Sequence, residues 1–251
     1  MRYRPEGNDI VIENGTRRFN RALYGGNTAF RAEAGDLPEF ALYMPGMGGN
    51  LKFGIVANAR PDDPDGRGKS KWLIECKKIK AIYRAGSMLY EIKDELLGEG
   101  MIRLHVIALY ANEGIIVQLQ TENVSTAVKL VAVYGGATGK NFSRDGDIGA
   151  DPESSFYLKP EYCKDNIYKI NQNNFTLLYG FAKPLSEEER YEVQHLPAGA
   201  KNNSAAADKG KELFGLFPET AVLKMADATK QQSPVTLLQS CLLYTSDAAD
   251  E

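Results

Sequence analysis

The sequence contains few of the residues that usually mark a metal or nucleophilic site. Its 251 residues include three cysteines, two histidines and one tryptophan. Cys76 and Cys163 belong to no CxxC pair and have no histidine close by, so the spacing of a zinc site is absent. A disulfide between them would require an oxidising compartment, whereas isolated cysteines are usually buried, so two core thiols are expected. His105 lies in a strand pattern with no serine or cysteine nucleophile near it, and no catalytic triad is predicted.

An excess of one charge and long apolar runs are missing as well. Thirty basic and 33 acidic side chains give a formal net charge of −3, which argues against a nucleic-acid-binding surface. No apolar run approaches the roughly 20 residues that cross a bilayer, and the first residues, MRYRPEGNDI, contain no apolar signal core. With 43% hydrophobic and 25% charged residues the composition is that of a globular chain, which excludes disordered and collagen-like classes.

What the sequence does contain is a period-two alternation of polar and apolar residues, which is typical of half-buried β-strands. Asn14-Gly15 predicts a tight hairpin between the first two strands. The predicted strands are residues 9–13, 17–25, 28–34, 39–44, 51–57, 71–85, 87–93, 101–111, 114–122, 127–135, 166–170 and 174–182.

Strands at this short spacing, separated by Gly, Pro, Asn and Asp, predict an all-β fold: a large, supersandwich-like antiparallel β-sandwich over residues 1–183. Residues 184–240 are predicted to be a mixed linker with one strand at 220–227. A short helix is expected to begin after Ser233 as N-cap, with Pro234 at its first position. That helix is expected to lead into a further domain that this sequence lacks.

The last eleven residues, Cys241 to Glu251, have a different expected origin. CLLYTSDAADE is the translation of a transposon-end adapter used in sequencing libraries, so we expect a non-native tail. The natural part would then be a fragment whose own end lies beyond residue 240.

Two glycine-rich stretches were tested as nucleotide-binding motifs. GGATGKN, residues 135–141, has three residues between Gly135 and the Gly139-Lys140 pair where a P-loop has four, and Asn141 replaces the Ser or Thr. GMGGN, residues 46–50, lacks the third glycine of a dinucleotide fingerprint. Both are interpreted as turns.

The acidic loop at residues 144–153 is the best chemical candidate. It places four carboxylates beside one arginine, in the residues Arg144, Asp145, Asp147, Asp151 and Glu153. Three interpretations stay open: a calcium site, because hard cations prefer several oxygen ligands; a contact with sugar hydroxyls; or a solvated loop held by Asx turns. No metal or cofactor is assigned, and a calcium titration without a thermal shift would remove the first interpretation.

Two blocks carry a family resemblance: residues 14–55, from NGTRRFNRALYGG to LKFGI, and residues 144–166, RDGDIGADPESSFYLKPEYCKDN. They resemble the bacterial domain-of-unknown-function family numbered 4450, over about residues 1–240. The resemblance implies a polysaccharide-utilisation protein that is periplasmic or secreted. Its N-terminal β-sandwich would precede a helical toroid similar to six-hairpin glycosidases.

By this resemblance, the catalytic carboxylates are expected beyond residue 240, and the fragment itself is not expected to be catalytic. Oligo- or polysaccharide and the missing C-terminal domain are the implied partners. The segment from Arg21 to Tyr24 and the 144–153 loop are the predicted ligand contacts. An independent carbohydrate-binding or surface-assembly module, without catalysis, is the alternative.

Overall fold

A computed structural model of the chain describes residues 3–44, 46–57, 69–124, 128–139, 163, 166–180, 211–226 and 234. Strands dominate these residues and form three sheets, so the predicted all-β class is confirmed. The chain divides into two compact units. The first contains residues 1–44, 49–135 and 225–251, and the second contains residues 45–48 and 136–224.

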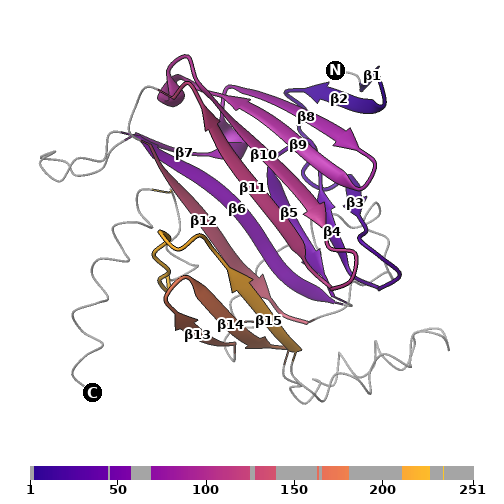
Figure 1. The fold of residues 1–251 in the computed structure, drawn as a ribbon, viewed down its shortest axis with the longest axis vertical. Helices are drawn as coiled ribbons and strands as arrows, with labels where there is room; N and C mark the ends of the chain where they lie inside the picture. The colour runs from indigo at the N-terminus through magenta and orange to yellow at the C-terminus, as the bar shows by residue number, and fades with distance from the viewer. Residues whose placement is uncertain are drawn as a thin grey trace, which may run out of the picture. The chain divides into compact units, whose positions relative to one another are not determined.

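The first sheet has the strand order β1-β2-β8-β9-β10-β11 and is antiparallel throughout (Figure 1). On β10 the apolar residues Ile102, Leu104 and Val106 are buried, while the residues between them face the other side. This alternation gives the sheet one core face, as the sequence predicts. The strands are β1 (Arg4–Glu6), β2 (Asp9–Glu13), β8 (Lys78–Arg84), β9 (Ser87–Lys93), β10 (Met101–Ala108) and β11 (Ile115–Glu122).

The second sheet has the order β12-β6-β5-β4-β3, and β7 pairs with β6 away from this path. Its central strands β4 and β5 are buried at every position, so both faces of the sheet are covered there. The strands are β3 (Arg21–Leu23), β4 (Arg31–Ala34), β5 (Glu39–Tyr43), β6 (Met47–Ala57), β7 (Lys69–Trp72) and β12 (Val128–Ala137).

An aromatic contact and a hydrogen bond join the two sheets face to face in the first unit. The ring of Phe40 on β5 meets Tyr90 on β9 edge-on at 5.9 Å between centroids, and it meets Phe53 on β6 at 6.4 Å. The buried Tyr90 hydroxyl donates a hydrogen bond of 2.8 Å to the Gly35 carbonyl. Burying such a side chain contributes about 2–3 kcal/mol, and the hydroxyl bond fixes where the sheets meet. These contacts make the unit a β-sandwich.

The second unit contains a smaller sheet with the order β13-β14-β15. Its strands are β13 (Ile167–Asn171), β14 (Asn174–Tyr179) and β15 (Lys211–Leu216). The strands predicted at 166–170 and 174–182 correspond to β13 and β14, which pair antiparallel through a turn with Gln172 in the left-handed region at φ 52°. Phe175 lies against Tyr168, Phe217 and Gly215, where a Cβ would come within 2.2 Å of its ring.

The hairpin predicted at Asn14-Gly15 is wrong. Asn14 does adopt a positive φ of 49°, but its side-chain oxygen accepts a hydrogen bond of 2.9 Å from the Ile79 amide. β2 therefore pairs with β8 on that side and with β1 on the other, through a two-residue turn at Gly7-Asn8. Of the predicted return strand at 17–25, the structure forms β3, which pairs with β4.

The single strand predicted over 71–85 is also wrong. It is divided into β7, the 3₁₀ turn η1 (Leu73–Glu75) and β8, because the Glu75 carboxylate accepts the Trp72 amide proton at 3.0 Å. A second 3₁₀ turn, η2 (Glu95–Leu97), is capped by Asp94, which accepts from the Leu96 amide. The GMGGN stretch forms the start of β6 rather than a turn, and Gly49 accommodates a φ of 101° there.

In the C-terminal part the strand lies elsewhere than predicted. The strand predicted at 220–227 is absent over the described residues 221–226, where Val222 and Met225 are mostly exposed. A strand forms instead over 211–216, as β15. The predicted helix start is supported at Pro234, which is helical and buried. A Cβ at Gly54 on β6 would lie 2.6 Å from the Pro234 ring, so this proline packs on the sandwich. Ser233 and the predicted domain boundary at 183/184 lie outside the described residues.

Candidate functional site

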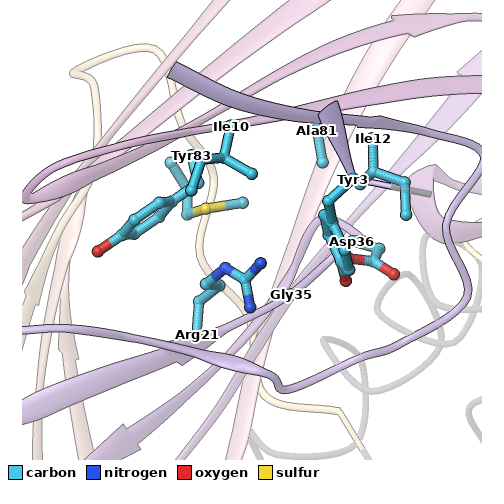
Figure 2. Close-up of a pocket in the computed structure, with 9 residues that line it drawn as sticks. Tyr3, Ile10, Ile12, Arg21, Gly35, Asp36, Ala81 and Tyr83 are labelled. Atoms are coloured by element: carbon cyan, nitrogen blue, oxygen red, sulfur yellow. The ribbon is translucent and has the colours of Figure 1, made fainter. Parts of the chain in front are cut away.

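The Arg21 side chain, one of the predicted ligand contacts, lies between two tyrosine rings. Its guanidinium carbon is 4.8 Å from the ring centroid of Tyr3 and 5.6 Å from that of Tyr83. Figure 2 shows Arg21 between these two residues. One of its nitrogens also donates to the Asn20 carbonyl at 2.8 Å. Cation–π contacts of this kind contribute about 0.5–2 kcal/mol, depending on exposure. Arg21 therefore links the β3 edge of the second sheet to strands of the first.

Asp36 forms the polar part of the same region. It is buried, and its carboxylate accepts hydrogen bonds from the Tyr3 hydroxyl at 2.6 Å and the Arg17 amide at 3.1 Å. Burial, followed by the bond to Asp36, raises the pKa of Tyr3. Gly15 is required beneath the carboxylate, because a Cβ there would lie 2.4 Å from the Asp36 carboxyl carbon. Asp36 is thus held by the fold from several sides.

The depression between these groups is small. Tyr3, Ile10, Arg21, Asp36 and Tyr83 contribute to its lining (Figure 2). It has room for about one water molecule, whereas pockets for organic ligands usually occupy hundreds of cubic ångströms. A sugar ring does not fit into this space, and ligand contact by Arg21 stays a prediction.

Tyr24, the other described member of the predicted contacts, is placed differently. Its side chain is 58% exposed, just after β3 ends. The next residues, Gly25 and Gly26, lie against the chain that follows β10. A Cβ at Gly25 would be 1.7 Å from the Leu109 carbonyl oxygen, and a Cβ at Gly26 would be 2.3 Å from that of Tyr110. Tyr110 is itself 84% exposed, so each of the two backbone segments that meet here carries an exposed tyrosine.

Tyr110 was missed by sequence reasoning, which placed it inside a strand over 101–111. The strand ends at Ala108, and the Leu109 amide bonds to the Gly114 carbonyl at 2.9 Å, which closes the turn. The Asn112-Glu113-Gly114 turn signal, which begins two residues after Tyr110, could have placed Tyr110 at the tip of the hairpin. Nothing local could have placed its backbone against the glycines that follow Tyr24.

The acidic loop lies outside the described residues. Its predicted contacts and the calcium alternative therefore stay predictions, namely Arg144, Asp145, Asp147, Asp151 and Glu153. Within the described ranges no group of three or more His, Cys, Asp or Glu side chains is arranged to hold a metal ion. In the same ranges, no helix has the length and apolar character that a membrane span requires.

Two buried carboxylates of the second sheet are paired with arginines. Glu33 bonds to the Arg31 guanidinium, and both side chains are buried. Burial raises the pKa of Glu33, although Arg31 acts in the opposite direction. Glu39 bonds to Arg18, whose Nε donates at 3.0 Å.

Asp94 is likewise occupied by structural bonds. It accepts from Lys71 Nζ at 2.9 Å and from the amides of Lys77 and Leu96. Burial raises the pKa of Asp94, but these donors outweigh burial, and the net pKa lies below the usual range.

The isolated Cys and His residues take structural positions. Cys76 is a buried thiol, as expected, and burial raises its pKa to about 12, so it stays protonated at neutral pH. Cys163 is half-buried rather than a core residue. His105 is half-buried on β10 and lies opposite Gln118 of β11 and Leu89 of β9.

Comparison with known proteins gives one family. No curated protein and no solved structure matches the chain. The family match begins at residue 44, so the resemblance noted over residues 1–43 stays a prediction. It ends at residue 246, inside the segment expected to derive from an adapter, and the origin of that segment also stays a prediction. The match covers residues 44–246, which is most of the chain, so the chain belongs to the family described as Domain of unknown function (DUF4450).

Proposed function

We propose that this chain is a non-catalytic β-sandwich module of a carbohydrate-active protein. The sandwich would act as an accessory domain next to a glycoside hydrolase domain similar to six-hairpin glycosidases, in a periplasmic or secreted polysaccharide-utilisation protein. Membership of the family and the resemblance of residues 14–55 and 144–166 support the assignment. The observation that supports the non-catalytic assignment is that the buried carboxylates are bonded to basic side chains.

Hydrolysis of a glycosidic bond needs two carboxyl groups that reach the substrate, one of them with a raised pKa. Glu33 has a raised pKa, but its side chain is 3% exposed and bonded to Arg31. Asp94 and Glu39 are similarly held by Lys71 and Arg18. A glycosidic oxygen does not reach any of these groups, so they support the fold rather than acid–base chemistry.

The neighbouring domain is part of the proposal through the family resemblance, and the helical residue Pro234 lies on Gly54 of β6. A stand-alone carbohydrate-binding module is the second candidate. The exposed Tyr24 and Tyr110 favour binding in either arrangement, because aromatic side chains that present an apolar ring and a polar hydroxyl suit sugar surfaces.

A glycan array and a reducing-sugar assay on the same preparation of the 251-residue chain test the proposal. We expect retention of the protein on one class of glycan and no release of new reducing ends from it. Release of reducing ends would overturn the non-catalytic assignment. A folded protein, verified by circular dichroism, that binds no glycan would overturn the carbohydrate assignment.

A further inference from the structure

We propose that Tyr24 and Tyr110 together form a sugar-stacking platform that takes the apolar face of a pyranose ring. This inference rests on the proposed carbohydrate function and names the surface that would carry it. The two residues are 86 positions apart in sequence, and both lie in the first unit, in the loop after β3 and the turn after β10. Figure 1 shows these two loops at the same end of the strands.

Steric packing fixes the place where the backbone of Gly25 and Gly26 meets that of Leu109 and Tyr110. Gly25 and Gly26 have no Cβ, and only this lets their backbone approach the carbonyls of Leu109 and Tyr110 so closely. The Leu109 amide and the Gly114 carbonyl close the opposite turn. A ligand surface made of two loops gains affinity when the loops are held in place before binding, since less conformational freedom is then lost.

The exposure of the two side chains needs an explanation that packing does not supply. Tyr24 is 58% exposed and Tyr110 is 84% exposed, although other tyrosines of the same unit, such as Tyr43 and Tyr90, are buried. Tyrosine is enriched at recognition surfaces because it presents an apolar ring together with a polar hydroxyl. Each offers a flat ring for the C–H face of a sugar, together with a hydroxyl for its polar edge.

Polar neighbours favour a glycan over a protein partner. The tip of the β10–β11 turn next to Tyr110 consists of exposed residues, and Asn112 and Glu113 provide an amide and a carboxylate there. These groups can hydrogen-bond sugar hydroxyls around a stacked ring. The exposed Ile107 and Ile116 lie opposite each other on the adjacent strands, and two isoleucines add little to the area that a stable protein interface needs. The chemistry thus points to a neutral or weakly charged glycan.

Affinity electrophoresis of the full 251-residue chain tests this proposal. The probes are native gels cast with soluble glucan, mannan, xylan or galactan, and the mobility shift gives the binding constant. We expect Tyr24→Ala and Tyr110→Ala each to weaken binding about tenfold, because each removes one ring. Tyr24→Phe and Tyr110→Phe keep the rings, and their affinity should stay within about threefold of the wild type. Phe214→Ala, an exposed aromatic residue of β15, is the matched control and should bind like the wild type.

A glycine substitution separates the platform from the mere presence of two tyrosines. Gly26→Ala leaves both rings in the chain but places a Cβ against the Tyr110 carbonyl, so binding should fall as in the tyrosine variants. Gly135→Ala adds its methyl group to open space and is the control. Thermal melting of each variant verifies that the fold is retained.

The outcomes distinguish the two proposals. If the wild type is retarded and the Tyr24→Ala/Tyr110→Ala double variant is retarded equally, the platform is overturned while the carbohydrate function stands. If the wild type is retarded in no gel and binds no glycan on the array, both proposals fail. If the wild type self-associates in sedimentation experiments and the double variant does not, the two tyrosines form a contact between protein copies, and the platform is likewise overturned.

Discussion

Charged residues are used in two different ways within the first unit. On the outer face of the first sheet, ion pairs join neighbouring strands at the surface, such as Arg84 with Asp9 and Arg103 with Glu122. In the second sheet, Arg31 and Glu33 pair while both are buried. Surface pairs are screened by water and contribute little, whereas a buried pair that loses one partner leaves a desolvated charge. The same residue types therefore act as a solvated surface in one sheet and as a structural requirement in the other.

Removal of the Glu33 carboxylate should produce the largest effect. Glu33→Ala removes the carboxylate that is bonded to the buried Arg31 guanidinium, and we expect a loss of about 3–5 kcal/mol in the free energy of unfolding. Urea denaturation measures it, with Glu6→Ala on the exposed β1 as the control. The double variant Arg31→Met/Glu33→Leu should recover most of the loss, because no charge remains buried. A loss as small as that of the control would contradict the distinction between the two regions.

Glu39→Ala should have an intermediate effect. Its partner Arg18 has a side chain that is 51% exposed, so the guanidinium is hydrated by water once the carboxylate is removed. We expect a loss of about 1–2 kcal/mol in the same denaturation experiment. Glu39→Gln, which keeps an acceptor for the Arg18 Nε proton, should lose less. A loss equal to that of Glu33→Ala would show that exposure of the arginine does not matter.

The pH dependence of the free energy of unfolding tests the burial of Glu33 separately. The pKa of Glu33 is raised above its ordinary value of 4.5, so the folded protein holds this proton at pH values where the unfolded chain releases it. Stability should therefore fall as pH rises from about 4.5 through the folded-state pKa. Glu33→Gln should remove this part of the slope. An unchanged slope between pH 4 and 7 in the variant would contradict the assignment of the raised pKa.

The smallest effect is expected on the outer face of the first sheet. Arg84→Ala removes two hydrogen bonds to the Asp9 carboxylate, of 2.9 and 2.7 Å, but the Arg84 side chain is 58% exposed, and water replaces it beside the carboxylate. We expect no change in the denaturation midpoint beyond experimental error, at low and at high salt. A clear, salt-dependent loss would show that this surface network stabilises the fold as the buried pair does.

Prediction from the sequence worked best where local patterns decide the structure. The alternation in SMLYEIK places β9 at Ser87–Lys93, as predicted, and the turn residues Ala85-Gly86 connect it to β8. It failed where a distant group completes a local motif. Asn14 has the left-handed backbone of a hairpin turn, yet its side chain bonds to Ile79, and the chain continues to another sheet.

The candidate site shows the same limit. The sequence singled out Tyr24 but not Tyr110, because only the packing of Gly25 and Gly26 on the β10–β11 turn brings the backbone that follows Tyr24 against that of Tyr110. Arg21 was predicted beside Tyr24 as a second contact. Its position between the rings of Tyr3 and Tyr83 depends on three segments that meet only in the folded chain.

The all-β class, the succession of antiparallel strands and the family follow from local patterns, since alternation and turn chemistry are encoded within a few neighbouring residues. Which strands pair and which charged residues are buried depends on contacts between distant segments. RAEA on β4 reads as a half-exposed strand, and all four of its residues are buried. The physical reason is that burial depends on what covers each face of a sheet, which a two-residue period does not specify.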